Sequence, residues 1–239
     1  MKQNSLLPLL TSWIENNHSA CLAIVISTWG SAPRQPGSTM VIRDDLHVEG
    51  SVSGGCVEGE VIRLSQEVMI DGIPRLKQFG VADESAWEVG LSCGGNISVL
   101  ILPVADTGIS LSILKQLNAA ENKRKPLDLI FNISDIKKLN IIVQNPSSPM
   151  NFVHKSIYNE KEQIFTLRIR PRNQVIIVGA GHISQVLSQL SVAMDLDVTV
   201  IDPRSVFLNE KRFPDIELRL GWPQDILPNL SIDAQTAIV

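Results

Sequence analysis

Two short segments of this chain place a cysteine next to a pair of glycines. In the first, SGGCVE at 53–58, Ser53 suits a helix N-cap, and the glycines let other groups approach the backbone closely. This pattern predicts Cys56 in the first turn of a helix. Unpaired N–H groups and the helix dipole would there favour a thiolate, and they could also hold a phosphate. A small buried cysteine beside a tight turn is the alternative.

The second segment is SCGG at 92–95, directly before an apolar strand. Two such turns in one domain could face each other around one ligand, with the sulfurs of Cys56 and Cys93 on the order of 10 Å apart, about the width of a small-molecule pocket. The alternative is a turn with an incidental cysteine. A zinc site is not favoured, because there is no C-x-x-C spacing. Cys21 lies inside an apolar run and is predicted to be a core residue.

A loop stiffened by two prolines, GSAPRQPGS at 30–38, carries Arg34 as its only charge. A fixed arginine on a rigid loop suits bidentate binding of phosphate or carboxylate, and a solvated arginine is the alternative. His18, His47 and His154 stand alone in the sequence, so we expect each to be a surface or hydrogen-bonded residue. No Ser/His/Asp arrangement supports a hydrolase.

A third motif, GAGHIS at 179–184, follows the apolar strand VIIV and opens a helix. Gly179 would make the turn, and Gly181 would let a pyrophosphate approach. Asp202, about 20 residues further on at the end of the next strand, would reach a ribose hydroxyl. His182 would sit over the phosphates or be an exposed first-turn residue. Arg204 leaves the choice between NAD and NADP open.

These motifs need a scaffold, which the apolar patterning predicts. We expect an α/β protein: a mixed α/β domain at 1–170, followed at 171–239 by a Rossmann-like domain with a parallel sheet. The C-terminal strand QTAIV ends the chain, so the second domain is expected to be incomplete and to self-associate through this half. The predicted elements are helices at 6–15, 53–71 and 109–121, strands at 20–30, 39–43, 47–52, 76–81, 96–104 and 126–134, and a strand–helix–strand unit at 173–202 followed by strands at 216–222 and 235–239.

Composition narrows the class of protein. The 239 residues hold 21 Lys and Arg against 25 Asp and Glu, which argues against a nucleic-acid binder. Three cysteines without paired spacing fit a reducing compartment, so no required disulfide is expected. No apolar stretch approaches the roughly 20 residues of a membrane span, and no signal-peptide pattern is present. A cytoplasmic protein is expected.

Six segments occur in one order along the chain, and together they resemble the XdhC/CoxI family, maturation factors of xanthine dehydrogenase and related molybdenum hydroxylases. They are GSAPRQPGSTM (30–40), SGGCVEGEV (53–61), SCGGNISVLILP (92–103), VGAGHISQVLSQL (178–190), DPR (202–204) and RFP (212–214). Ser92 departs from the glycine that the family usually has at this position.

The resemblance implies a non-enzymatic chaperone that holds the molybdenum cofactor (molybdopterin) during sulfuration and then delivers it. Implied partners are a client such as xanthine dehydrogenase and a cysteine desulfurase-type sulfur donor, in addition to the further copies of the chain expected from the C-terminal strand. NAD(P) is a weaker expectation. The alternatives are a nucleotide-dependent oxidoreductase or transferase and a purely structural partner protein. The implied cofactor-binding residues are Arg34, Gly54, Gly55, Cys56, Glu58, Cys93, Gly94 and Gly95, with Cys56 and Cys93 as soft ligands of the metal; the implied nucleotide-binding residues are Gly179, Gly181, His182 and Asp202.

Overall fold

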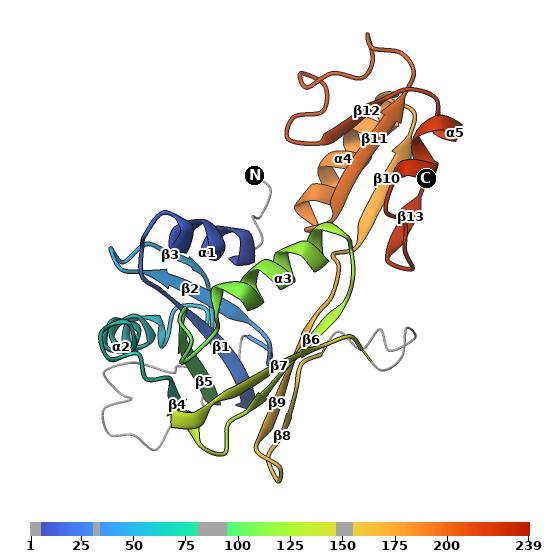
Figure 1. Ribbon diagram of the computed structural model, residues 1–239. Helices are drawn as coiled ribbons and strands as arrows, with labels where there is room; N and C mark the ends of the chain where they lie inside the picture. The colour runs from blue at the N-terminus through green and yellow to red at the C-terminus, as the bar shows by residue number, and fades with distance from the viewer. Residues whose placement is uncertain (1–5, 31–33, 81–94, 147–154) are drawn as a thin grey trace. The chain divides into compact units, whose positions relative to one another are not determined.

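The computed structural model describes residues 6–30, 34–80, 95–146 and 155–239 (Figure 1). The described chain forms two compact units. One contains the described parts of 6–121 and 126–169, and the other contains residues 122–125 and 170–239. The short segment 122–125, which the sequence predicts to lie in the first domain, therefore belongs by its contacts to the C-terminal unit.

The N-terminal unit is built on a five-stranded antiparallel sheet. Its strand order is β3 (Val48–Gly50), β2 (Thr39–Arg43), β1 (Ala20–Trp29), β5 (Asn96–Pro103) and β4 (Arg75–Phe79). The central strand β1 is buried on both faces from Ala20 to Ile26, which explains why its sequence is continuously apolar rather than alternating.

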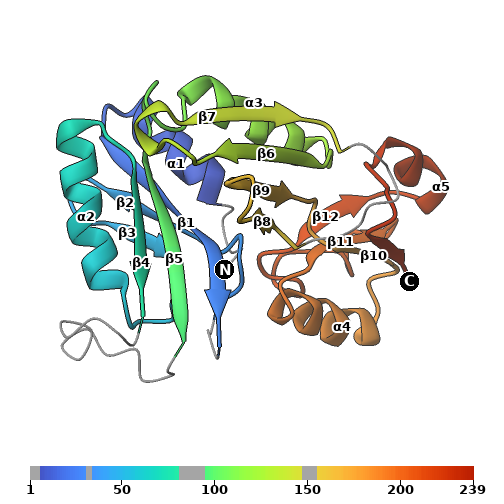
Figure 2. The ribbon, with the colours of Figure 1, turned by 90° about the horizontal axis from the view of Figure 1, so that it is seen from below.

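Each face of this sheet packs against a different layer. On one face, the odd-numbered β1 residues Cys21, Ala23 and Val25 contact α2 (Glu58–Asp71) through its buried stripe Val61, Leu64 and Val68. On the other face, the even-numbered residues join a core with α1 (Leu6–Glu15), α3 (Leu111–Asn122) and a second sheet. Figure 2 shows α2 on the side of the sheet opposite to α1 and α3.

The second sheet of this unit is also antiparallel. Its order is β7 (Asn140–Gln144), β6 (Leu127–Asn132), β9 (Ile164–Ile169) and β8 (Ile157–Asn159), with a short 3-10 helix, η2 (Ile136–Lys138), between β6 and β7. Phe131 of β6 and Phe165 of β9 are fully buried, with ring centroids 5.8 Å apart. These aromatic rings anchor the second sheet in the shared core.

The C-terminal unit contains a four-stranded parallel sheet in the order β12 (Glu217–Leu220), β11 (Asp197–Asp202), β10 (Gln174–Val178) and β13 (Thr236–Ile238). Helix α4 (His182–Ala193) follows β10, and α5 (Pro223–Ile226) and η3 (Leu227–Asn229) precede β13. The sheet reverses its strand order between β10 and β13, as doubly wound folds do. The expected fold class, a mixed α/β domain followed by a Rossmann-like domain with a parallel sheet, is confirmed.

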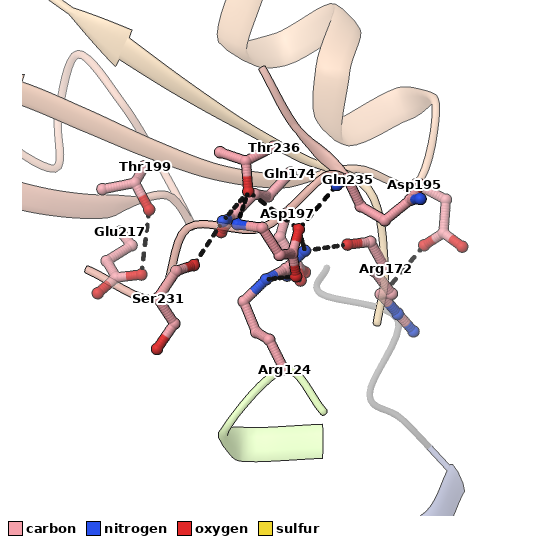
Figure 3. A network of polar contacts seen from close by, with 11 residues as sticks. Arg124, Arg172, Gln174, Asp195, Asp197, Thr199, Glu217, Ser231, Gln235 and Thr236 are labelled. Atoms are coloured by element: carbon pink, nitrogen blue, oxygen red, sulfur yellow. Dashed lines mark hydrogen bonds and ion pairs between the residues drawn. The ribbon is translucent and has the colours of Figure 1, made fainter. Parts of the chain in front are cut away.

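A polar network holds segment 122–125 to this unit (Figure 3). The side chain of Arg124 is only 10% exposed. Its Nε donates to Asp233 Oδ2 at 2.9 Å, and its Nη2 donates to the carbonyl oxygen of Arg172 at 2.6 Å. Asp197 lies 3.6 Å away as a second ion-pair partner.

Most of the predicted elements are present. The bounds of α1 and β2 agree with the prediction, whereas α2 begins at Glu58, five residues after the predicted start. The strand expected at 47–52 spans only Val48–Gly50. No helix among the described residues is long and apolar enough to cross a membrane.

Candidate functional site

The antiparallel order of the first sheet brings two motif-bearing loops, and the strand ends that flank a third motif, to one end. Strands β1, β3 and β4 finish at this end, and β2 and β5 begin there. The loop with Arg34 connects β1 to β2, the loop with Cys56 follows β3, and the segment with Cys93 connects β4 to β5. Cys93 and Gly94 lie outside the described residues, and Gly95 is buried directly before β5.

The loop before α2 is organised around the carboxylate of Glu58. Six donors within residues 51–55 point at its two oxygens, four of them consecutive backbone N–H groups. Oε1 accepts hydrogen bonds from Ser51 Oγ at 2.8 Å, Val52 N at 3.2 Å, Ser53 N at 2.9 Å and Gly54 N at 3.1 Å. Oε2 accepts hydrogen bonds from Gly55 N at 2.9 Å and from Ser53 Oγ. Left-handed backbone at Gly54 (φ 81) and Gly55 (φ 117) gives the loop this curvature.

This arrangement corrects two expectations about Cys56. The helix begins at Glu58 with Val57 as its N-cap, so Cys56 precedes the first turn. The backbone N–H groups of Cys56 and Val57 donate to Ser53 Oγ at 2.9 and 3.0 Å, and those of residues 52–55 are taken by Glu58. The predicted unpaired N–H groups are therefore already satisfied by side chains of the loop.

The electrostatics of Glu58 follow from this contact set. Partial burial by itself would raise the pKa of Glu58, but hydrogen bonds from Ser53 and Ser51 outweigh it and lower the pKa from 4.5 to about 2. Glu58 is thus an ionised anchor of the loop. Both of its carboxylate oxygens accept hydrogen bonds from the loop, and a cofactor contact of Glu58 stays a prediction.

The thiol that this loop presents is Cys56. Cys56 is free and partly exposed, and it packs at the edge of the α2-side core. An added Cβ would meet nothing within 4 Å at Gly55 or at Gly59, so the backbone on either side of Cys56 borders open space. Cys21, by contrast, is fully buried, and burial raises the pKa of its thiol to about 12. The prediction that Cys21 is a core residue is confirmed.

The loop with Arg34 takes its shape from Gly37. Its backbone is left-handed (φ 95), and an added Cβ would lie 2.4 Å from Ser156 Oγ, so only glycine fits against the chain preceding β8. Arg34 is exposed. At the same end of the sheet Trp29 is 72% exposed, although its sequence context predicts a buried strand residue.

The isolated histidines that the structure describes are surface groups with acidic neighbours. Nδ1 of His18 lies 3.0 Å from Asp44 Oδ1, and Nε2 of His47 lies 3.5 Å from Glu49 Oε1. His154 falls outside the described residues. Among the residues described, no three His, Cys, Asp or Glu side chains gather as a metal site would require.

The glycine turn of the C-terminal unit lies between β10 and α4, as expected. Gly179 is left-handed (φ 104), and an added Cβ at Gly179 or at Gly181 would meet nothing within 4 Å. His182 is the exposed first residue of α4. Gly181 is the N-cap of this helix.

Asp202, the predicted ribose contact, is buried and hydrogen-bonded within the protein. It is 1% exposed, and its Oδ2 accepts hydrogen bonds from Ala180 N at 2.7 Å and from Arg204 Nη2 at 2.8 Å. Its Oδ1 accepts from Arg204 N at 2.8 Å and from Arg204 Nε at 3.0 Å. The guanidinium of Arg204 holds the pKa of Asp202 well below its ordinary value. A ribose hydroxyl would have to displace Arg204 to reach this carboxylate.

Comparison with known proteins gives matches in both units. The profile of the XdhC and CoxI family matches residues 13–80, and that of the XdhC Rossmann domain matches residues 175–239. A Bacillus subtilis protein, named as a probable component of xanthine dehydrogenase, is 23% identical over 97% of this chain and 74% of its own length. The Escherichia coli molybdenum cofactor insertion chaperone PaoD is 32% identical over 47% of this chain and 34% of its own length.

A solved structure agrees in fold along the whole chain. The crystal structure described as a xanthine dehydrogenase from Bacillus halodurans has a TM-score of 0.78 and 24% identity, over 100% of this chain and 74% of that one. This chain thus spans about three quarters of that protein and of the B. subtilis relative, but about a third of PaoD. With one profile on the Cys56 region and a second on the parallel-sheet unit, the chain belongs to the XdhC and CoxI family.

Proposed function

We propose that this protein is a molybdenum cofactor-binding chaperone whose N-terminal domain, 1–170, holds the cofactor and delivers it to a molybdenum hydroxylase of the xanthine dehydrogenase type. Membership of the XdhC and CoxI family supports the proposal, as does a relative named as a molybdenum cofactor insertion chaperone. The observation that carries it is the Cys56 loop: a free, partly exposed thiol on a backbone that the Glu58 carboxylate holds in shape.

The donor set of the loop fits the metal end of the cofactor. A thiolate is a soft ligand suited to a soft metal centre. The open backbone at Gly55 and Gly59 leaves room for a bulky ligand beside the thiol. The bound cofactor supplies the molybdenum centre that the client enzyme needs.

The same loop does not fit the phosphate end. Its four N–H groups at residues 52–55 already donate to Glu58, so a second anion would have no donors there. We assign the phosphate instead to Arg34, an exposed cation on the neighbouring loop of the same sheet end. Cys93, with Gly94 and Gly95, is proposed as the second thiol-bearing turn at this end.

The partners follow from this role. We propose that a cysteine desulfurase-type donor supplies sulfur to the cofactor while the chaperone holds it in the cytoplasm. We also propose that the chain forms a homo-oligomer. Light scattering across a concentration series tests the last point, with a variant lacking residues 171–239 as the comparison.

The decisive experiment compares two cysteines that differ in exposure. The parent, Cys56→Ala and Cys21→Ala are each titrated with molybdopterin, and binding is read from pterin fluorescence. We expect Cys56→Ala to lose at least tenfold in affinity and Cys21→Ala to bind like the parent. Equal binding by the parent and Cys56→Ala would refute the central role of this thiol, and nicotinamide-dependent turnover by the parent would favour an oxidoreductase instead.

A further inference from the structure

A cluster of two arginines and one aromatic ring lies beside the glycine turn of the C-terminal unit. The Arg204 guanidinium carbon lies 4.6 Å from the centre of the Phe207 ring, and that of Arg212 lies 5.2 Å from the same centre. Phe207 itself is 40% exposed. Two guanidinium groups thus lie against one partly exposed ring.

Hydrogen bonds fix both arginines next to the turn. Arg204 is held by Asp202, which also accepts the backbone N–H of Ala180 from the turn itself. Arg212 makes two hydrogen bonds with Gln185, which lies in the first turn of α4. Arg212 Nη2 donates to Gln185 Oε1 at 3.0 Å, and Gln185 Nε2 donates to the Arg212 carbonyl at 3.3 Å. The two guanidinium groups are therefore anchored before any ligand arrives.

The state of Asp202 decides which ligand fits. An acidic group at the end of this strand favours an unphosphorylated ribose only if its oxygens can accept the ribose hydroxyls. Here Oδ1 and Oδ2 each accept two hydrogen bonds, which fills the roughly four acceptor positions of a carboxylate. Arg204 uses Nε and one Nη2 proton for Asp202, and its side chain is still 59% exposed. Arg204 therefore keeps guanidinium donors that Asp202 does not use, on a side chain that solvent reaches.

We propose that the C-terminal unit binds an adenine nucleotide that carries a phosphate on its ribose, the NADPH class, and discriminates against the unphosphorylated NADH class. Arg204 and Arg212 hold the ribose phosphate. The open backbone at Gly179 and Gly181 borders the rest of the nucleotide. The site is independent of the Cys56 loop, because all of its residues belong to the C-terminal unit.

The test uses the full chain and four probes. NADPH and NADH are titrated by their fluorescence, and 2′,5′-ADP and 5′-AMP compete with them. We expect the parent to bind NADPH at least tenfold more tightly than NADH, since a charge-assisted hydrogen bond contributes about one tenfold step or more. We also expect 2′,5′-ADP to compete more strongly than 5′-AMP. Equal affinity for the two dinucleotides, or binding of neither, would overturn the proposal.

Variants separate the two arginines from general charge. Arg212→Gln leaves Asp202 untouched and should lose about tenfold in NADPH affinity with NADH binding unchanged. Arg204→Gln frees the carboxylate of Asp202, so NADPH binding should weaken while NADH binding strengthens. Arg219→Gln, at an exposed arginine of β12 paired with Glu217, is the matched control and should retain the parent preference. A loss in Arg219→Gln equal to that in Arg212→Gln would reduce the effect to net charge and refute the assignment.

Discussion

Replacing Glu58 by glutamine tests whether its carboxylate shapes the Cys56 loop. The substitution keeps the size of the side chain and one acceptor oxygen. Its NH2 group must then face either the Gly55 N–H that now donates to Oε2 or the three N–H groups of residues 52–54 that now donate to Oε1. We expect the loop to open. Cofactor binding should then fall although Cys56 itself is unchanged.

The magnitude follows from the pKa of Glu58. A displacement from 4.5 to about 2 corresponds to about 3 kcal/mol at 1.36 kcal/mol per unit. Because the side chain is only partly buried, solvent screening reduces this to about 2 kcal/mol. At roughly 2–4 °C per kcal/mol for a protein of this size, Glu58→Gln should lower the melting temperature at pH 7 by about 4–8 °C.

The pH dependence has a definite sign. The pKa of Glu58 is lower in the folded protein than in the unfolded chain, so its contribution is complete above pH 4.5 and is lost as the pH falls toward 2. The difference in unfolding free energy between parent and variant should therefore shrink over that interval. Urea denaturation at pH 7, 5, 4 and 3 measures it.

The control is Glu60→Gln on the same helix. Glu60 pairs with the exposed Arg63, a surface contact that contributes at most about 1 kcal/mol. If the two variants unfolded at the same urea concentration at pH 7, or if the difference from the parent did not change with pH, the anchoring role of Glu58 would be wrong.

Three further perturbations address other parts of the structure. In the native protein at pH 8, iodoacetamide should modify Cys56 and leave Cys21 intact, because Cys21 is buried and the pKa of its thiol is raised to about 12. Peptide mass spectrometry distinguishes the two cysteines. Equal labelling of both would contradict the described core. Gly37→Ala should destabilise the N-terminal unit by about 3 kcal/mol or more, because backbone strain adds to the clash with Ser156. Gly55→Ala should destabilise it by about 1 kcal/mol, from backbone strain alone. Similar urea midpoints for the two variants would be inconsistent with the packing at Ser156. Arg124→Ala should destabilise the C-terminal unit by about 3 kcal/mol because Asp233 loses its charged partner, while Lys123→Ala should be near neutral. Equal effects of the two variants in calorimetry would contradict the network in Figure 3.

The sequence is most informative where burial determines the spacing of apolar residues along the chain. The stripe Val61, Leu64 and Val68 predicts α2 and its buried face, and the apolar run at 20–26 predicts a strand covered on both sides. Local pattern also places the glycine turn between β10 and α4. In these cases neighbours in sequence face the same environment, so the pattern is sufficient.

Interactions between side chains and loop backbone are not predicted by these patterns. Family resemblance makes Glu58 a cofactor ligand, although a glutamate shortly after Ser-Gly-Gly is placed to cap the loop, as in a capping box. The two-residue spacing of Asp202 and Arg204 is a similar local signal for their contact. The Gly37–Ser156 approach and the Arg124–Asp233 pair join residues more than 100 positions apart, and no local pattern signals such partners.

The central strand β1 has a consequence for how the N-terminal unit comes apart. Its odd-numbered residues complete one hydrophobic core and its even-numbered residues complete the other, so neither core can be exposed without dismantling the same strand. Partial opening that spares one layer is thereby suppressed. The backbone amide hydrogens of Leu22, Ala23 and Ile24 should therefore exchange only through global unfolding, and the two layers should unfold as one cooperative unit.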